Sequence, residues 1–199
     1  MKIYSCKISD FSEEEFSKHF YAMNAERKES TLRLKNVKKQ KARIAADYLC
    51  RLALSEFCKI SKEQIGFALT ANGKPYAVNC KAKFNISHSG DYVVCAVSDK
   101  EIGIDIEKIR PISPKAADRF ACPNELDYIS SNESGLFEIW TLKEAYFKCI
   151  GTGLGADIKN VSFKIKKDGI VCSENGFDCS FFKIADGYIC AVCEKEKEK

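Results

Sequence analysis

Apolar and polar positions repeat with two different periods along this chain. Apolar residues recur at helical spacing over 38–58 and again over 136–150, which predicts two amphipathic helices. A further helix is expected to begin in 111–120, where Ser113 precedes Pro114 as a cap and first-turn pair. The long helices therefore fall once in each half of the chain.

Strand patterns occupy most of the remaining sequence. The clearest is 101–109, where isoleucines alternate with smaller or charged residues, so that Asp105 and Glu107 share one face of the strand. Further strands are expected at 1–8, 83–86, 92–98, 161–165, 170–172, 180–184 and 188–192, with a turn at 72–75. This mixture predicts an α+β fold of two lobes with largely antiparallel sheets, and a solvated tail at 194–199.

Composition agrees with a globular protein. The chain has 199 residues, of which 45% are hydrophobic and 30% charged, enough for one large domain or two small packed lobes around a real core. No apolar run is long enough to span a bilayer, and the first residues turn acidic without a signal-peptide pattern. We therefore expect a cytoplasmic protein that does not enter the membrane.

The formal net charge of +4 is too small to argue for nucleic acid as a partner. The stretch 27–43 nevertheless holds eight Lys or Arg residues and one acid, Glu29. It could meet a phosphate-rich ligand or an acidic partner. Taken alone, this stretch favours the simpler interpretation of a solvated helix face.

The 11 cysteines are scattered through apolar segments, which predicts reduced and mostly buried thiols. Cys190 and Cys193 form a CxxC pair, but no second pair or suitably spaced histidines follow it as a zinc site requires. The pair lies in an expected strand, where positions three apart face opposite sides. We therefore expect both cysteines to be packing residues.

The strand over 101–109 carries the first candidate for chemistry. Asp105 and Glu107 lie about 7 Å apart on one face, where their side chains can converge on a hard cation such as Mg²⁺. Gly103 shares that face and leaves room for close approach. The alternative is an edge strand with an acidic solvent face, which a bare pair of this kind favours.

The helix over 136–150 carries the second candidate. Glu144 and Lys148 lie one turn apart, opposite the apolar stripe. They suit an ordinary surface pair, or a carboxylate that binds Mg²⁺ or takes a proton beside an ammonium that meets phosphate. The large rings of Trp140 and Phe147 flank this polar stripe, which is unusual for a fully solvated face.

The third candidate is the polar run Ser87-His88-Ser89-Gly90. Adjacent serine and histidine cannot form a catalytic triad by spacing alone. The run better suits a turn that offers hydroxyl, imidazole and backbone N–H groups to an anion. A histidine satisfied within a loop is the competing interpretation.

Together these segments resemble the 4′-phosphopantetheinyl transferase superfamily, most closely its larger class, which activates peptide and polyketide synthetases such as surfactin synthetase. The matching motifs are NGKPY at 72–76, FNISHSGDYVV at 84–94, IGIDIEKIRPIS at 102–113 and WTLKEAYFKCIGTGL at 140–154. They stand in the family's order and cover most of the chain. The resemblance implies a pseudo-twofold monomer with lobes at 1–100 and 101–199, and the active site and coenzyme A cleft between them.

The resemblance also implies roles for individual residues. Mg²⁺ would bind to Asp105, Glu107 and Glu144. Lys148 would contact the coenzyme A phosphates and assist the leaving group. The nucleotide end, with its 3′-phosphate, would be held by Arg43, Lys74, Ser87 and His88. Glu125 resembles a further acidic position of the family, and Lys28 and Arg33 fit its basic region.

The implied function is transfer of the 4′-phosphopantetheine moiety of coenzyme A to a serine of an apo acyl or peptidyl carrier protein, with Mg²⁺ and release of 3′,5′-ADP. The alternative is a non-catalytic module that binds coenzyme A or a phosphorylated ligand. Such a module would need the basic and Ser-His elements but not three acids and a lysine. Another Mg²⁺-dependent phosphotransferase lacks support, because the sequence has neither a P-loop motif nor a kinase signature.

Overall fold

Two three-stranded antiparallel sheets with the same topology form the centre of the molecule. In the computed structural model, which describes residues 1–153 and 155–196, each sheet places the first strand of its lobe at one edge and the last strand in the middle. The N-terminal sheet has the order β1 (Lys2–Lys7), β5 (Tyr92–Ser98), β4 (Lys83–Ser89). The C-terminal sheet has the order β6 (Ile102–Lys108), β10 (Tyr188–Lys195), β9 (Phe177–Phe182).

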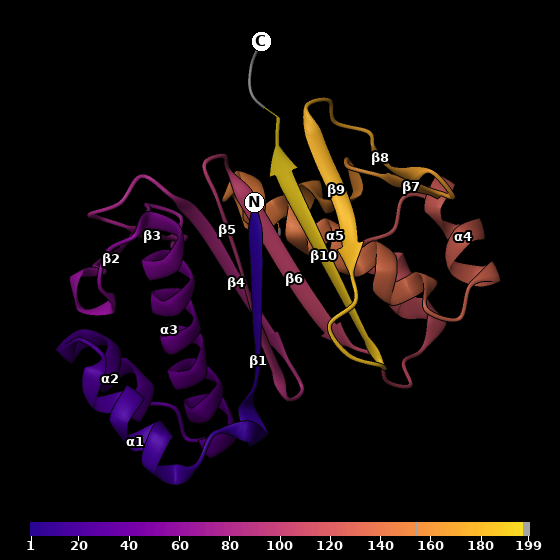
Figure 1. Ribbon diagram of the computed structural model, residues 1–199. Helices are drawn as coiled ribbons and strands as arrows, with labels where there is room; N and C mark the ends of the chain where they lie inside the picture. Colours follow the sequence, from indigo (N-terminus) through magenta and orange to yellow (C-terminus); the bar gives the residue numbers. More distant parts are fainter. Residues whose placement is uncertain (154, 197–199) are drawn as a thin grey trace.

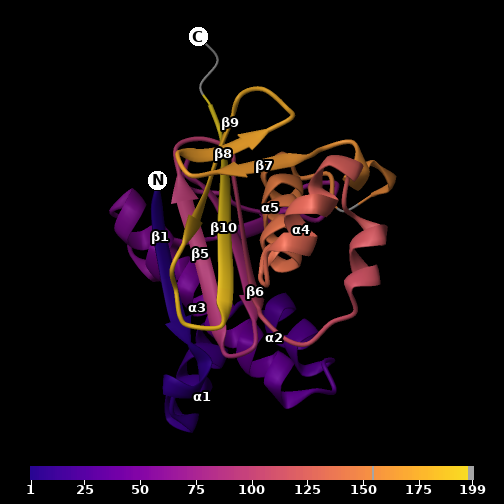
Figure 2. The same cartoon turned by 90° about the vertical axis from the view of Figure 1, so that its right-hand side faces the viewer.

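Each lobe also has one long helix and one small hairpin between its first and later strands. These are α3 (Val37–Cys58) with β2 (Phe67–Leu69) and β3 (Pro75–Ala77), and α5 (Gly135–Ile150) with β7 (Phe163–Lys166) and β8 (Gly169–Cys172). The sheets meet in the middle and the long helices lie outside them (Figure 1, Figure 2). The repeated order of elements confirms the predicted α+β fold of two similar, pseudo-twofold-related lobes.

The smaller helices surround these lobes. They are η1 (Ile8–Asp10), α1 (Glu13–Ala22), α2 (Ala25–Leu32), η2 (Lys62–Gln64), η3 (Pro114–Arg119), η4 (Pro123–Glu125), α4 (Leu126–Ser131) and η5 (Ala156–Lys159). The sequence analysis did not predict α1 and α2. Their starts carry local signals, because the hydroxyl of Ser12 accepts from the backbone N–H of Glu15 and the side chain of Asn24 accepts from that of Arg27.

Helix α3 forms where the apolar period predicted a helix. It begins after Asn36, whose side chain caps the backbone N–H of Lys39 at 3.2 Å, and it ends at Lys59 in the left-handed conformation. Its apolar side packs onto β5, with Ala45 and Ala53 fully buried. Burying each large apolar side chain in such an interface stabilises the fold by about 1.5–3 kcal/mol.

Helix α5 approaches β6 unusually closely. A Cβ atom on Gly103 would lie 2.0 Å from the carbonyl oxygen of Ala145 and 2.3 Å from the backbone nitrogen of Cys149. The backbone of α5 therefore fills the space beside Gly103, and the expectation that this glycine leaves room for a ligand is wrong. The consequence is that side chains of α5 reach those of the β6 face that carries Asp105.

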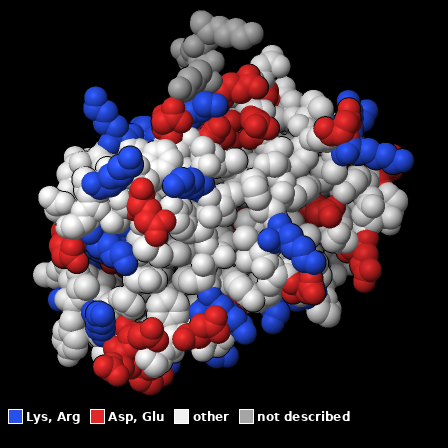
Figure 3. All heavy atoms as spheres, in the orientation of Figure 1, with Lys and Arg blue, Asp and Glu red and all other residues white. Residues whose placement is uncertain are grey.

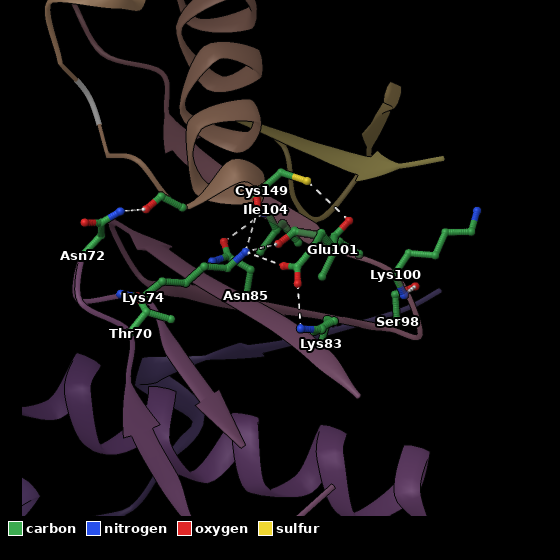
Figure 4. A network of polar contacts seen from close by, with 12 residues as sticks. Thr70, Asn72, Lys74, Lys83, Asn85, Ser98, Lys100, Glu101, Ile104 and Cys149 are labelled. Atoms are coloured by element: carbon green, nitrogen blue, oxygen red, sulfur yellow. Dashed lines mark hydrogen bonds and ion pairs between the residues drawn. The ribbon is translucent and has the colours of Figure 1, made fainter. Parts of the chain in front are cut away.

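The two sheets meet where β4 lies beside β6. The side chain of Asn85 on β4 accepts a hydrogen bond from the backbone N–H of Ile104 on β6 at 3.0 Å (Figure 4). A shared core of side chains from both sheets closes the rest of this junction, comprising Val94, Ala96, Ile102, Ile104, Ile106, Cys190 and Val192. The lobes are thus joined by apolar packing with polar bridges along one edge.

The structure corrects three expectations of the sequence analysis. Strand β4 continues through Ser89, so Ser87 and His88 lie on a strand paired with β5, and the turn follows at Gly90. Within the tail expected at 194–199, β10 extends to Lys195 and hydrogen bonds from Ser98 and Lys100 hold Glu194, while 197–199 lie outside the described residues.

The cysteines are the third correction. Cys179 on β9 and Cys193 on β10 are joined by a disulfide, because they are directly opposite each other in the strand register. The nine other cysteines are free thiols, and five of them are buried. Cys190 is buried in the shared core, as expected of a packing residue.

Charges of both signs are interspersed over the face seen in Figure 3. This distribution agrees with the small net charge of +4. None of the helices within the described residues combines the length and apolar character that crossing a membrane requires.

Candidate active site

A row of serine hydroxyls on β4 holds the two carboxylates of β6. The hydroxyl of Ser87 donates to Oδ1 of Asp105 at 2.6 Å, and that of Ser89 donates to Oε2 of Glu107 at 3.0 Å. Because alternate residues of a strand share a face, the two serines meet the two acids in register. The predicted Asp105–Glu107 pair therefore lies at the junction of the two lobes rather than on a solvated edge.

Lys148 of α5 completes this junction. Its ammonium donates to Oδ1 of Asp105 at 2.5 Å and to the hydroxyl of Ser87 at 3.1 Å. Asp105 is only 3% exposed, and this burial raises the pKa of its carboxyl, while the Lys148 ammonium opposes the shift. Oδ2 of Asp105 is buried and has no hydrogen-bond partner among the described residues.

Glu107 and Glu144 form the second part of the acidic cluster. The indole Nε1 of Trp140 donates to Oε1 of Glu107 at 3.1 Å, which fixes the carboxylate together with Ser89. Burial raises the pKa of Glu144 to about 7. Lys148 lowers this pKa, and the nearby acids Asp105 and Glu107 raise it.

His88 lies among cations on the other face of β4, toward α3. Loss of solvent lowers the pKa of its imidazole, and Lys148 and Arg43 lower it further. Arg43 of α3 donates to the carbonyl oxygen of Ser30 at 2.9 Å. His88 therefore lies within electrostatic range of both Lys148 and Arg43, although the three residues come from three different elements.

A cavity of about 580 Å³ opens beside Arg43, between α2, α3 and the β2–β3 hairpin. Its apolar lining includes Phe67, Leu69, Pro75, Phe84 and Ile86. Arg27, which the sequence analysis did not single out, also lines this cavity and lies 3.7 Å from Asp47. Burial lowers the pKa of the Arg43 guanidinium, and the nearby Arg27 lowers it further. Ring surfaces beside guanidinium groups suit a ligand with both a base and phosphate.

Lys74 lies apart from the acidic cluster. Its ammonium donates to the carbonyl oxygen of Cys149 at 2.7 Å and pairs with Glu101 at 3.2 Å, as Figure 4 shows. It thus ties the β2–β3 hairpin to the C-terminal end of α5. Its neighbour Pro75 lines the cavity beside Arg43.

Glu125 is also separate from the three acids. It is fully buried and pairs with the equally buried Lys143 at 3.0 Å. Its carboxylate also accepts from the backbone N–H groups of Cys122 at 2.7 Å and Phe163 at 2.8 Å. These contacts give Glu125 a structural role behind α5.

The sequence analysis included Ser89 in the candidate run 87–90 but gave it no role, gave none to Arg27, and noted Trp140 only as a flanking ring. Ser89 had a recognisable signal, because it follows Ser87 at strand spacing. Arg27 had none beyond its place in the basic stretch, since its approach to Arg43 depends on how α2 packs on α3.

The acidic cluster offers carboxylate oxygens, the donors that a hard divalent cation prefers. Within 1–153 and 155–196, no three His, Cys, Asp or Glu side chains are arranged as a ready metal site. Lys148 donates to Asp105, while Trp140 and Ser89 donate to Glu107. The donor chemistry nevertheless fits Mg²⁺, because Oδ2 of Asp105 is unpartnered and crowded acids help raise the pKa of Glu144.

Carboxylates suited to a hard cation, an ammonium beside them and a basic cavity with aromatic walls define an enzyme that acts on a phosphate-bearing ligand. Comparison with known proteins agrees. Residues 101–193 match the family described as the 4′-phosphopantetheinyl transferase superfamily, and residues 10–100 match the family described as 4′-phosphopantetheinyl transferase, N-terminal.

Individual relatives cover nearly the whole chain. A 4′-phosphopantetheinyl transferase of Bacillus subtilis is 32% identical over 205 residues, covering 97% of this chain and 92% of the relative. The 4′-phosphopantetheinyl transferase gsp of Aneurinibacillus migulanus is 34% identical, covering 86% and 76%. The solved holo-acyl-carrier-protein synthase of Thermotoga maritima aligns at 24% identity with a TM-score of 0.42, covering 50% of this chain and 64% of that chain.

The chain therefore belongs to the 4′-phosphopantetheinyl transferase superfamily, in its larger, surfactin-synthetase-activating class. It is an enzyme that transfers the 4′-phosphopantetheine group. The alternative of a non-catalytic binding module is not supported.

Proposed function

We propose that this enzyme moves the 4′-phosphopantetheine moiety of coenzyme A onto a serine of an apo acyl or peptidyl carrier protein, with Mg²⁺ and release of 3′,5′-ADP. The observation that carries the proposal is the contact of Lys148 with Asp105 and Ser87, beside Glu107 and Glu144. One ammonium and three carboxylates near one another at the junction of the lobes support a site that handles a phosphate group with a metal ion.

The nucleotide end of coenzyme A fits the cavity of about 580 Å³. Phe67 and Phe84 offer ring surfaces to the base, while Arg43 and Arg27 meet phosphate. His88, which Arg43 influences electrostatically, contributes an imidazole to the 3′-phosphate. Lys74 supports the wall of this site from the hairpin.

The diphosphate then lies between the cavity and the acidic cluster. Lys148 is positioned to move its ammonium from Asp105 to the diphosphate, where it offsets charge on the leaving 3′,5′-ADP. Bound Mg²⁺ would supply further charge compensation, held by Asp105, Glu107 and Glu144.

The reaction itself exchanges one phosphorus–oxygen bond for another. The serine oxygen of the carrier bonds to the β-phosphorus of coenzyme A, and the bond from that phosphorus to the bridging oxygen of 3′,5′-ADP breaks. The base that takes the serine proton is Glu144, whose pKa of about 7 suits that role at neutral pH, or a water that the bound metal would hold.

We further assign lobes 1–100 and 101–199 to the two sides of the coenzyme A cleft. The cations Arg27 on α2 and Arg43 on α3 and the acids of β6 are all needed at once, so neither lobe is a complete site. A monomer then suffices for activity. We place the enzyme in the cytoplasm, where coenzyme A and carrier proteins meet.

The experiment mixes the full chain with coenzyme A, Mg²⁺ and several apo carrier proteins, and follows intact carrier mass. We expect the added phosphopantetheine arm on at least one carrier, and its absence when EDTA removes the metal. Glu144→Gln is the matched control that preserves shape while removing the acid. Carriers that stay apo at every enzyme concentration would refute the assigned acceptor class.

A further inference from the structure

Two thiols outside the active site lie unusually close together. Cys58 is the last residue of α3, and Cys80 follows strand β3. Their sulfur atoms are 2.7 Å apart, although the residues are separated by 22 positions. A shift of less than about 1 Å would bring the sulfurs to the disulfide bond length of about 2.05 Å.

The backbone already holds the segment around Cys80 in place. The backbone N–H of Val78 donates to the carbonyl oxygen of Gly66 at 3.0 Å, and the N–H of Gly66 donates to the side chain of Asn79 at 3.1 Å. The backbone of Ala82 hydrogen-bonds to the thiol of Cys58. The two thiols are therefore juxtaposed by the fold, and joining them requires no change in strand pairing.

Both thiols can be reached from outside. Each is partly exposed, and Cys80 lines a groove of about 560 Å³ whose rim includes Lys74, Lys81 and Lys83. Glu101 lines the same groove and pairs with Lys74 and Lys83, and the excess of cations that remains, with Lys81 beside Cys80, favours an anionic reagent. By contrast, Cys50 and Cys95 are buried, with their sulfurs 3.9 Å apart, which makes them a natural control.

We propose that Cys58 and Cys80 are a modification site, a dithiol that an anionic small-molecule disulfide such as oxidised glutathione converts reversibly into an intramolecular disulfide. The Cys80 thiolate attacks one sulfur of the reagent and expels one thiolate. The Cys58 thiolate then attacks the Cys80 sulfur and expels the second thiolate.

Atoms and electrons balance in this exchange. The two protons lost from Cys58 and Cys80 pass to the two departing thiolates, the protein is oxidised by two electrons, and the reagent is reduced by two. Burial, and to a smaller extent the neighbouring Cys80, raise the pKa of the Cys58 thiol to about 11. At neutral pH only a small fraction of Cys58 is therefore thiolate, the form that attacks.

The disulfide would constrain one wall of the cavity beside Arg43. The closed loop contains the β2–β3 hairpin, which contributes Phe67, Leu69 and Pro75 to that wall. Helix α3, to which the hairpin becomes tied, forms the facing wall. Oxidation should therefore reduce local opening of the hairpin without touching the acidic cluster.

The test treats the full reduced chain with oxidised glutathione, alkylates the remaining thiols and digests with trypsin. We expect peptide 52–59 linked to peptide 63–81, with Cys50 and Cys95 alkylated only after unfolding. Hydrogen exchange of the hairpin amides should slow by roughly tenfold, and dithiothreitol should reverse both effects. Cys58→Ser should stop at a glutathione adduct on Cys80.

Two variants guard against a folding artefact. Cys50→Ser should form the same linked peptides, and reduced Cys58→Ser should keep wild-type transfer activity because Cys58 touches no site residue. The proposal is overturned if wild-type Cys58 and Cys80 stay alkylatable after prolonged treatment. It is equally overturned if stable glutathione adducts accumulate on both thiols without a link.

Discussion

The ammonium of Lys148 lies 2.5 Å from Oδ1 of Asp105, although the two residues are 43 positions apart in the sequence. This ion pair joins α5 to β6 within the acidic cluster. A surface helix pair between Glu144 and Lys148 would instead leave Asp105 buried without a cation. The functions of the cluster can therefore be separated by substitutions on these two elements.

Glu144→Gln is expected to lower the transfer rate by roughly a hundredfold or more, because it removes a metal ligand and the proposed base while keeping the shape. A mere surface role would change stability by at most about 0.5 kcal/mol and leave the rate alone. Single-turnover transfer to an apo carrier measures the difference. Wild-type turnover would end the catalytic assignment of this helix.

Lys148→Ala should also slow transfer, but its effect should not multiply with that of Glu144→Gln, since both groups act on one transition state. The double variant is expected to be little slower than the worse single variant. Rates of all four enzymes under the same conditions complete the cycle. A simple product of two mild losses would count against a shared site.

Asp105→Asn is expected to nearly abolish transfer, because it removes one of the carboxylates proposed for Mg²⁺. Glu107→Gln should act in the same direction. Binding of Mn²⁺, followed by electron paramagnetic resonance, should weaken in both variants, and circular dichroism checks that each has folded. Near-normal activity at limiting Mg²⁺ would show that the substituted residue is not a ligand.

His88→Ala should raise the KM for coenzyme A more than the KM for dephospho-coenzyme A, which lacks the 3′-phosphate. A group that meets only that phosphate discriminates only when the phosphate is present. Arg27→Gln should behave alike if Arg27 shares the cavity as a phosphate ligand. Equal effects on both substrates would assign His88 to another part of the ligand.

The pH dependence of stability tests the environment of Glu144. Its pKa is about 7 in the folded chain against 4.5 as the ordinary value, so the folded state binds more protons between those values. The free energy of unfolding therefore falls as pH rises through this window. Above pH 7 the protein keeps the whole destabilisation that comes from ionising the buried Glu144 carboxyl. Glu144→Gln has no carboxyl to ionise at this position. In EDTA, the Tm of the variant relative to that of the wild type should therefore rise by a few degrees between about pH 5 and 8. A Tm difference that stays constant with pH would contradict the raised pKa.

The buried pair of Glu125 and Lys143 predicts a stability effect away from the cluster. Lys143→Met should destabilise the protein by about 3–5 kcal/mol, because it leaves a fully buried carboxylate without its cation. Adding Glu125→Gln should recover part of this loss. Denaturant unfolding measures both, and a single-variant loss below about 1 kcal/mol would contradict the pairing.

The sequence by itself determined the local faces of the main elements. Helical spacing identified α3 and α5, and strict alternation put Asp105 and Glu107 on one side of β6. The motif order also identified the family. These features are readable because they depend on residues only one to four positions apart.

Only the tertiary structure decided which side chains meet. In the folded chain Lys148 pairs with Asp105, and Ser89 and Trp140 donate hydrogen bonds to Glu107. Helix α5 packs against β6 at Gly103. It also joined Cys179 to Cys193 across β9 and β10. Such contacts bring together positions far apart in the chain, and they depend on the packing of whole helices and sheets, which no local period encodes.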